Sequence, residues 1–206
     1  MSKSLRVGVV GAGAMGADHI DRINNRTSGA YISAIVEPDA GRAAKAAENA
    51  PGAQTFAKIE DAIAADAVDA VLSAVPGQFH EPVLIPALEA GLPILCEKPL
   101  TPDSESSLRI VELEQKLDKP HIQVGFMRRF DAAYIQLRQL IESGQLGQLL
   151  TVHAAHRNQS TGEGYVDSML ITDSVIHEID VLPWLFGEPI AAVEVKKPRR
   201  NTLAPS

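Results

Sequence analysis

The segment VVGAGAMGADH, near the N-terminus, constrains the fold more than any other part of the sequence. Its glycines Gly11, Gly13 and Gly16 have the spacing G-x-G-x-x-G. An apolar run, Leu5–Val10, precedes them, and the pattern of Ala14–Asn25 predicts a helix after them. Three glycines alone are weak evidence, because the same spacing also occurs where a bend only closes a strand onto a helix. The order strand, tight turn and helix is the context in which such glycines bind a pyrophosphate.

Beyond the glycines, apolar strand-like runs alternate with helical patterns up to residue 124. The predicted strands are Tyr31–Val36, Ala70–Ala74, Pro93–Cys96 and Ile122–Val124. The predicted helices are Ala40–Asn49, Pro82–Ala90 and Pro102–Leu117. Strands that alternate with helices favour a parallel sheet covered on both faces. The sequence therefore predicts an α/β fold, with a doubly wound Rossmann sheet over residues 1–124.

The pattern changes after Gly125. The elements predicted there are a helix at Ala132–Glu142, a strand at Leu149–Ala155, a helix at Thr172–Leu185 and a strand at Ala191–Val195. Together they would form an α+β unit of only about 80 residues, which is small for a free-standing domain. We therefore expect residues 125–206 to be the start of a second, substrate-binding domain that is incomplete here.

Composition excludes several classes of protein. The chain has 206 residues, 45% of them hydrophobic and 22% charged, as in globular proteins. A net charge of −7 argues against nucleic acid as a partner, because phosphate binding draws on a surplus of Lys and Arg. No apolar run has the length of a membrane span, and no signal peptide is evident, so we expect no membrane partner and a cytoplasmic location. The single cysteine, Cys96, cannot form an internal disulfide, which suits a reducing compartment.

Glu37 is the sequence feature that indicates which dinucleotide binds. It ends the second predicted strand about 20 residues after the glycines, where an acidic residue binds the ribose hydroxyls of NAD. Its carboxylate would repel the 2′-phosphate of NADP, and Pro38 and Asp39 supply no positive charge. Arg42 is close enough in sequence to leave NADP open. We therefore expect NAD as the cofactor.

Three further side chains are candidates for chemistry. Lys98 follows a predicted buried strand, at the edge where open parallel sheets bind ligands, although an ordinary surface lysine is the alternative. Asp173 and His177 lie four residues apart on a predicted helix, so both would project from one face. Histidine titrates near neutrality, which makes His177 the candidate base and Asp173 its support. The alternative is a helix-capping aspartate followed by a structural histidine.

A metal site is another alternative for this helix. His153, His156, Asp173 and His177 would supply its ligands, and the letters HEIDV resemble the start of the zinc-binding pattern H-E-x-x-H. Val181, however, stands where that pattern requires its second histidine. We therefore expect no metal.

Five segments resemble the glucose-fructose oxidoreductase, inositol dehydrogenase and MocA family of NAD(P)-dependent sugar oxidoreductases. They are GAGAMG, SAVPGQFHEPVLIPALEAG, CEKPL, VGFMRRFD and DSVIHEIDVLPWLFG, and the resemblance runs over nearly the whole chain. It implies that Lys98, Asp173 and His177 form the catalytic group. The cofactor-binding residues that we expect are Gly11, Gly13, Ala14, Met15, Gly16, Glu37, Glu97 and Lys98.

The resemblance also implies a polyol substrate. The letters GFMRRFD and HRN are similar to the polyol-contacting segments of family members that oxidise inositol. The substrate-binding residues implied are Met127, Arg128, His156, Asn158, Asp173 and His177. Many fixed donors and acceptors suit a neutral, hydroxyl-rich ring, because analogues leave some of them unpaired.

The activity implied by the resemblance is NAD-dependent oxidation of myo-inositol to a keto-inositol. Hydride would pass to NAD and the hydroxyl proton to His177, while Lys98 stabilises the developing oxyanion. Another sugar or polyol remains open as the substrate. Family members are longer than this chain by about half, and their second domain supplies subunit contacts. The complete protein is therefore expected to be a homo-oligomer, a tetramer, and a non-catalytic NAD-binding module is the alternative for the present, truncated chain.

Overall fold

The computed structural model describes residues 4–157, 165–166 and 169–196. The chain divides into two compact units: Met1–Phe126 with Val166–Asp173, and Met127–Tyr165 with Ser174–Ser206. Asn158, one of the predicted substrate residues, lies outside the described residues. Within the described ranges, no helix combines the length and the apolar character that crossing a membrane requires.

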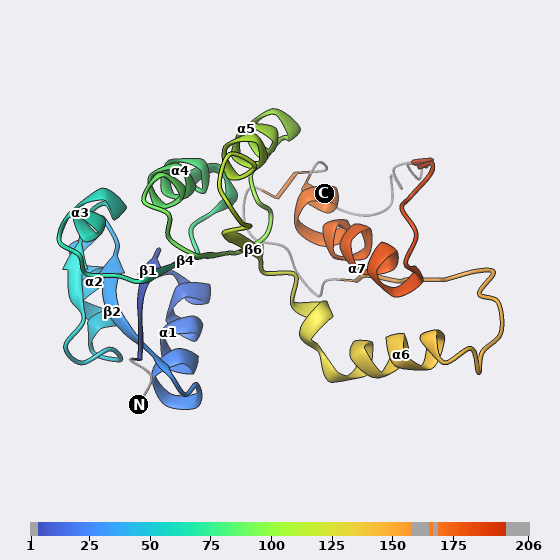
Figure 1. The fold of residues 1–206 in the computed structure, drawn as a ribbon, viewed down its shortest axis with the longest axis horizontal. Coiled ribbons are helices and arrows are strands. Elements are labelled where there is room, and N and C mark those ends of the chain that lie inside the picture. Colours follow the sequence, from blue (N-terminus) through green and yellow to red (C-terminus); the bar gives the residue numbers. More distant parts are fainter. Residues whose placement is uncertain (1–3, 158–164, 167–168, 197–206) are drawn as a thin grey trace, which may run out of the picture. The chain divides into compact units, whose positions relative to one another are not determined.

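A six-stranded sheet forms the centre of the first unit (Figure 1). Its strands are β1 (Leu5–Val10), β2 (Ala30–Val36), β3 (Gln54–Phe56), β4 (Ala70–Ser73), β5 (Ile94–Cys96) and β6 (Ile122–Val124). They lie in the order β3-β2-β1-β4-β5-β6, and every neighbouring pair is parallel. This is the order of a doubly wound dinucleotide-binding sheet, in which the winding reverses between β1 and β4. The predicted doubly wound sheet is confirmed.

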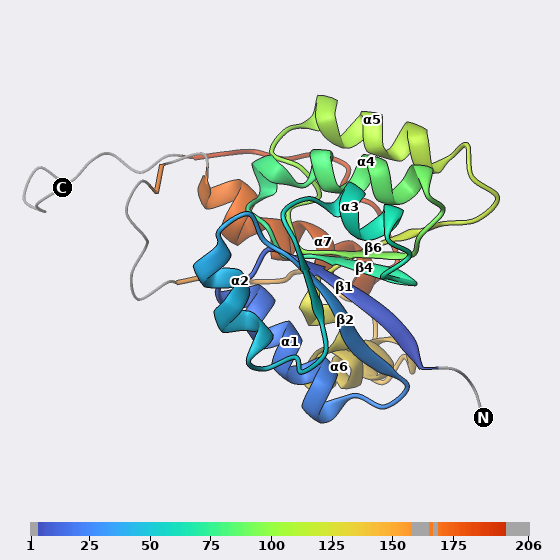
Figure 2. The same ribbon diagram turned by 90° about the vertical axis from the view of Figure 1, so that its left-hand side faces the viewer.

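Five α-helices cover the two faces of the sheet. They are α1 (Ala14–Arg26), α2 (Ala40–Ala47), α3 (Ile59–Ala64), α4 (Glu81–Glu89) and α5 (Ser104–Glu114). Figure 2 shows α1 and α2 on one face and the other three on the opposite face. Buried Ile20 of α1 packs with Val9 on the first face, and Leu84 of α4 with Val71 on the second. Each such burial stabilises the fold by about 1.5–3 kcal/mol relative to an exposed side chain.

The glycine turn joins β1 to α1, and its three glycines have different surroundings. Gly11 has a φ of +90°, in the left-handed region, and its N–H donates to the Val36 carbonyl at 2.8 Å. A Cβ on Gly16 would lie 1.9 Å from the Gly11 carbonyl oxygen. A Cβ on Gly13 would meet nothing within 4 Å. The backbone thus requires glycine at positions 11 and 16, whereas position 13 faces open space.

The second unit contains two helices in contact, α6 (Ala132–Glu142) and α7 (Ile176–Phe186). The Asp131 side chain caps the start of α6, and Gly187 ends α7 in the left-handed conformation, with a φ of +72°. The segment Leu170–Val175, whose residues up to Asp173 belong to the first unit, is a π-helix, although the sequence predicted an α-helix from Thr172 onward. Such turns are frequent at functional sites.

Two predicted strands of the second unit are wrong. Neither 149–155 nor 191–195 is a strand in the structure, and the described part of this unit contains no strand with which they could pair. Leu150 is 83% exposed and Val193 is 77% exposed. Alternating apolar residues form a strand only where a neighbouring strand accepts their backbone hydrogen bonds. In the first unit, by contrast, the structure adds three short elements that were not predicted: β3, α3 and a 3₁₀-helix at Gly77–Phe79.

Candidate active site

A cavity of about 660 Å³ lies at the carboxyl ends of β1, β2, β3 and β4. This edge, at the reversal of winding, is where open α/β sheets bind dinucleotides. Of the predicted cofactor residues, Gly11, Gly13 and Glu37 line the cavity. Ala14 lines a smaller adjoining cavity of about 280 Å³ that shares Gly13 and Arg42 with the first. The room beside Gly13 and the carboxylate at Glu37 fit a dinucleotide: a pyrophosphate at the turn and ribose hydroxyls at the carboxylate.

Glu37 is held as a buried carboxylate, only 6% exposed. It accepts hydrogen bonds from the N–H groups of Ala12 (3.0 Å) and Asp39 (3.1 Å) and from the Arg42 guanidinium (2.7 Å). Burial alone would raise the pKa of Glu37, but these hydrogen bonds together outweigh it and hold the pKa below its ordinary value. A fixed negative charge therefore faces the cavity, and the Arg42 charge, which had left NADP open, is paired with it.

Lys98 lies just beyond β5 at the same edge of the sheet, and its side chain contacts Asp173. The Lys98 Nζ donates to Asp173 Oδ1 at 2.6 Å and to the Asp173 carbonyl oxygen at 3.2 Å. Both residues belong to the first unit. Two of the three predicted catalytic residues, which are 75 positions apart in the sequence, are thus brought into one ion pair.

Glu97, beside Lys98, is a predicted cofactor residue that the structure pairs with His19 of α1. The His19 Nε2 lies 2.8 Å from Glu97 Oε1. The hydrogen bond from His19 lowers the pKa of Glu97, and this outweighs the opposing effect of burial. Met15, on the same helix, is half exposed.

The predicted residues of the second unit gather around α7. His177 is buried, only 6% exposed, and its ring stacks on that of His156, with 6.4 Å between the ring centroids. Arg128 donates to Glu178 Oε1, and the His156 Nδ1 lies 3.5 Å from Glu178 Oε2. Burial would raise the pKa of Glu178, but the hydrogen bond and charge of Arg128 lead the interactions that hold it below its ordinary value. Met127, another predicted substrate residue, is 56% exposed.

Sequence reasoning missed Glu178, which joins two predicted substrate residues. A signal was present, because Glu178 directly follows His177 and is separated from Asp180 by one residue. Asp180 pairs with Arg129, the neighbour of Arg128. Two consecutive arginines therefore pair with two acids that are separated by one residue. The signal in the sequence was the presence of two adjacent positive charges in MRRF and two nearby negative charges in HEID.

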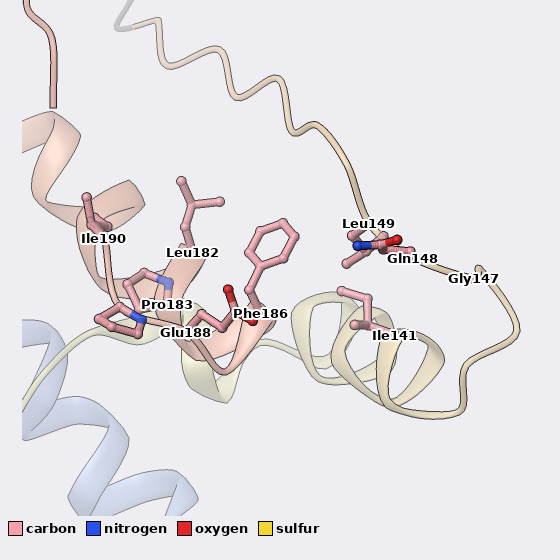
Figure 3. Close-up of a pocket in the computed structure, with 10 residues that line it drawn as sticks. Ile141, Gly147, Gln148, Leu149, Leu182, Pro183, Phe186, Glu188 and Ile190 are labelled. Atoms are coloured by element: carbon pink, nitrogen blue, oxygen red, sulfur yellow. The ribbon is translucent and has the colours of Figure 1, made fainter. Parts of the chain in front are cut away.

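One further cavity does not include the predicted residues. A cavity of about 470 Å³ in the second unit lies between the ends of α6 and α7, with Ile141, Leu182 and Phe186 among its lining (Figure 3). None of the predicted catalytic, cofactor or substrate residues lines it. Across the described ranges, no three His, Cys, Asp or Glu side chains are grouped as metal ligands would be.

A doubly wound sheet with a glycine turn, a buried acid after β2 and a lysine after β5 defines a dinucleotide-binding protein. The comparisons with known proteins agree. The oxidoreductase family with an NAD-binding Rossmann fold, Gfo/Idh/MocA, matches residues 5–126, and its C-terminal domain matches residues 134–202. The chain belongs to this family, as the resemblance predicted.

Individual relatives are similar over the whole chain. Inositol 2-dehydrogenase of Corynebacterium glutamicum (strain R) is 79% identical over 206 residues, which are all of this chain and 61% of that protein. The inositol 2-dehydrogenase of Leifsonia xyli subsp. xyli is 66% identical over 98% of this chain and 59% of its own length. The chain therefore spans about three fifths of these relatives.

Solved structures are also similar. The crystal structure of myo-inositol dehydrogenase from Lactobacillus casei in complex with NAD(H) and myo-inositol has a TM-score of 0.85 and 37% identity, over 89% of this chain and 55% of that one. The scyllo-inositol dehydrogenase of the same species, with NAD(H) and scyllo-inositol bound, has a TM-score of 0.77 and 25% identity, over 90% of this chain and 57% of that one.

Proposed function

We propose that the protein to which this chain belongs catalyses the NAD-dependent oxidation of myo-inositol to a keto-inositol. The observation that carries the proposal is the Lys98–Asp173 ion pair at the edge of the sheet where the dinucleotide cavity lies. Relatives that match the whole chain are inositol 2-dehydrogenases. Residues 1–124 are proposed to bind the cofactor, and residues 125–206 to begin the substrate domain.

The cofactor residues proposed are the glycine turn with Ala14 and Met15, together with Glu37, Glu97 and Lys98. Gly13 leaves room for the pyrophosphate, and the N-terminus of α1 faces it. Glu37 accepts hydrogen bonds from the ribose hydroxyls, and its negative charge disfavours a 2′-phosphate. Bound NAD supplies the acceptor for the hydride.

The catalytic roles proposed are divided among three side chains. His177 accepts the hydroxyl proton, because imidazole is the side chain whose ordinary pKa is nearest neutrality. The Lys98 ammonium stabilises the oxygen as it becomes negative. Asp173, expected from the sequence to support His177, is proposed instead to orient that ammonium through the 2.6 Å contact. General acid–base catalysis of this kind contributes about 10²–10⁴-fold to a rate.

The substrate residues proposed are Met127, Arg128, His156 and Asn158. Glu178 supports this set, because it pairs with Arg128 and lies near the His156 ring. Donors fixed in this way discriminate among polyols by leaving wrong hydroxyls unpaired. The protein is further proposed to act in the cytoplasm as a homo-oligomer.

The test is the absorbance of NADH formed from NAD and myo-inositol by the full-length enzyme, with a panel of other polyols beside it. In His177→Ala we expect turnover to fall by about 10³-fold while NAD binding stays within about threefold. Equal loss of binding and turnover contradicts the role of His177. The present chain is assayed in parallel: if it and the full-length enzyme bind NAD but oxidise no polyol, the alternative of a non-catalytic NAD-binding module is favoured instead.

A further inference from the structure

The Lys98 loop, residues 97–100, is bonded to a histidine that takes no part in the proposed reaction. His80, at the start of α4, is completely buried. Its Nδ1 lies 2.8 Å from the carbonyl oxygen of Pro99 and 3.1 Å from that of Leu100. A Cβ on Gly77 would lie 3.0 Å from the Pro99 ring, so the loop and the segment before α4 are in close contact.

These neighbours determine which ring nitrogen of His80 carries a proton. Carbonyl oxygens only accept hydrogen bonds, so Nδ1 must be a donor. The third neighbour of Nδ1 is the Cys96 Sγ, at 3.4 Å. Burial raises the pKa of the Cys96 thiol to about 12, so the thiol stays protonated, and it donates to the Glu97 carbonyl at 3.2 Å. The ring of His80 therefore contacts the backbone that directly follows Lys98 and the side chain of Cys96, two residues before it.

A second histidine, on the helix that follows the glycine turn, contacts the same loop. The His19 Nε2 lies 2.8 Å from the Glu97 carboxylate, and both side chains are mostly buried. His19 belongs to α1, the helix whose N-terminus forms the glycine turn. The residues immediately before and after Lys98 are thus each bonded to a different helix of the first unit.

We propose that His80 and His19 are positioning residues that fix the Lys98 loop and so place the Lys98 ammonium against the reacting oxygen. The proposal rests on the proposed function, because Lys98 has a reacting partner only there. Neither imidazole lines the dinucleotide cavity. Glu97 and Lys98 in this loop are also proposed cofactor residues, whereas the glycine turn and Glu37 lie outside it. Loss of either imidazole should therefore reduce turnover more than it weakens cofactor binding.

The kinetic test uses the full-length enzyme with His80→Leu and with the conservative His80→Asn, whose amide nitrogen takes the place of Nδ1 as a donor. Because a displacement of about 1 Å can cost about 100-fold in rate, we expect kcat to fall about 30-fold in His80→Leu and to recover to within about fivefold in His80→Asn. The dissociation constant of NAD should rise by a smaller factor than kcat falls, because the glycine turn and Glu37 are unchanged. His19→Leu should lower kcat about tenfold, and His19→Gln, which keeps a donor at the Nε2 position, should restore most of it.

A matched control is available at His121, another buried histidine, whose Nδ1 lies 2.7 Å from the Lys119 carbonyl oxygen. It makes the same kind of bond in the turn before β6. His121→Leu should leave kcat within about twofold of the wild type. If His80→Leu and His121→Leu lower kcat equally, or if neither conservative variant restores activity, the positioning role is overturned. If His80→Leu does not fold, the His80→Asn and His19 variants still decide the matter.

A spectroscopic test uses the present chain and does not depend on turnover. Nitrogen-15 NMR of labelled histidine should show the His80 proton on Nδ1, and the signal should be lost in His80→Asn. A ring with its proton only on Nε2 overturns the inference. If the full-length wild type oxidises no polyol while the Nδ1 proton is observed, the proposed function fails and the arrangement of the loop stands.

Discussion

The two units hold their candidate site residues in different ways. In the first unit the backbone does most of the positioning: the glycine turn, Glu37 and Lys98 all follow the carboxyl ends of buried parallel strands. In the second unit, side chains position one another through the pairs Arg128–Glu178 and Arg129–Asp180. A strand end is fixed by the whole sheet, whereas a charged pair depends on one partner. Substitutions should therefore have different effects in the two units.

The largest effect is expected from Gly16→Ala in the first unit. The added Cβ would lie 1.9 Å from the Gly11 carbonyl oxygen, so the turn or α1 must move. We expect a loss of at least about 3 kcal/mol in the free energy of unfolding, measured by urea denaturation of this chain. NAD binding should be lost as well.

Gly13→Ala is the matched control for this substitution. Its Cβ meets no atom within 4 Å, so stability should change by less than about 1 kcal/mol. Binding of NAD, measured by titration calorimetry, should nevertheless weaken, because the methyl group occupies space proposed for the pyrophosphate. Equal destabilisation by both substitutions would contradict the prediction that the contact with the Gly11 carbonyl oxygen is what excludes a side chain at position 16.

A smaller effect is expected from Glu178→Gln in the second unit. The amide cannot neutralise Arg128, so the proposed substrate residues should lose their orientation while the sheet stays intact. We expect the KM for myo-inositol to rise about tenfold in the full-length enzyme, with NAD affinity unchanged. Glu142→Gln, which alters an exposed pair with Arg138 on α6, should change neither quantity. A collapse of kcat with an unchanged KM would assign Glu178 to the chemical step instead.

The smallest expected effect is the loss of stability of the fold at acidic pH. Glu37 and Glu178, one in each unit, have folded-state pKa values below the ordinary 4.5. Each carboxylate therefore stabilises the fold above about pH 4.5, and this contribution is lost as the pH falls through the lower, folded-state pKa. The unfolding free energy of the wild type should fall between pH 6 and pH 3.5, and Glu37→Gln should flatten that curve by about 1 kcal/mol or less. Parallel curves for the wild type and the variant would contradict the lowered pKa.

Most of the first unit was predictable because parallel strands covered on both faces appear in a sequence as uninterrupted apolar runs. β1 matches its predicted bounds, and α4 differs from its prediction by one residue at each end. β3 and α3 were missed because they have only three and six residues, too few to show a period. The strands predicted at 149–155 and 191–195 fail for another reason: their alternation is real, but no described strand of the second unit is there to pair with them.

The candidate site was predictable where its residues follow strands or belong to a recognised motif. The Lys98–Asp173 contact could be proposed only from the family resemblance, because 75 residues separate the two. His19, His80 and Glu178 were missed because their roles come from contacts with residues that are distant in the sequence. Their partners are Glu97, Pro99 and Arg128, respectively. No local pattern encodes such contacts.

The ion pair between Lys98 and Asp173 also has a consequence for the substrate in the proposed reaction. A cation that is already neutralised at 2.6 Å attracts an anionic ligand weakly, and the neighbouring carboxylate repels it. Sugar acids, such as a uronate with the same ring hydroxyls, would have to separate this pair or bring a second negative charge beside it. In the proposed reaction, the resting arrangement of two charges would thus favour uncharged rings before any hydroxyl is recognised.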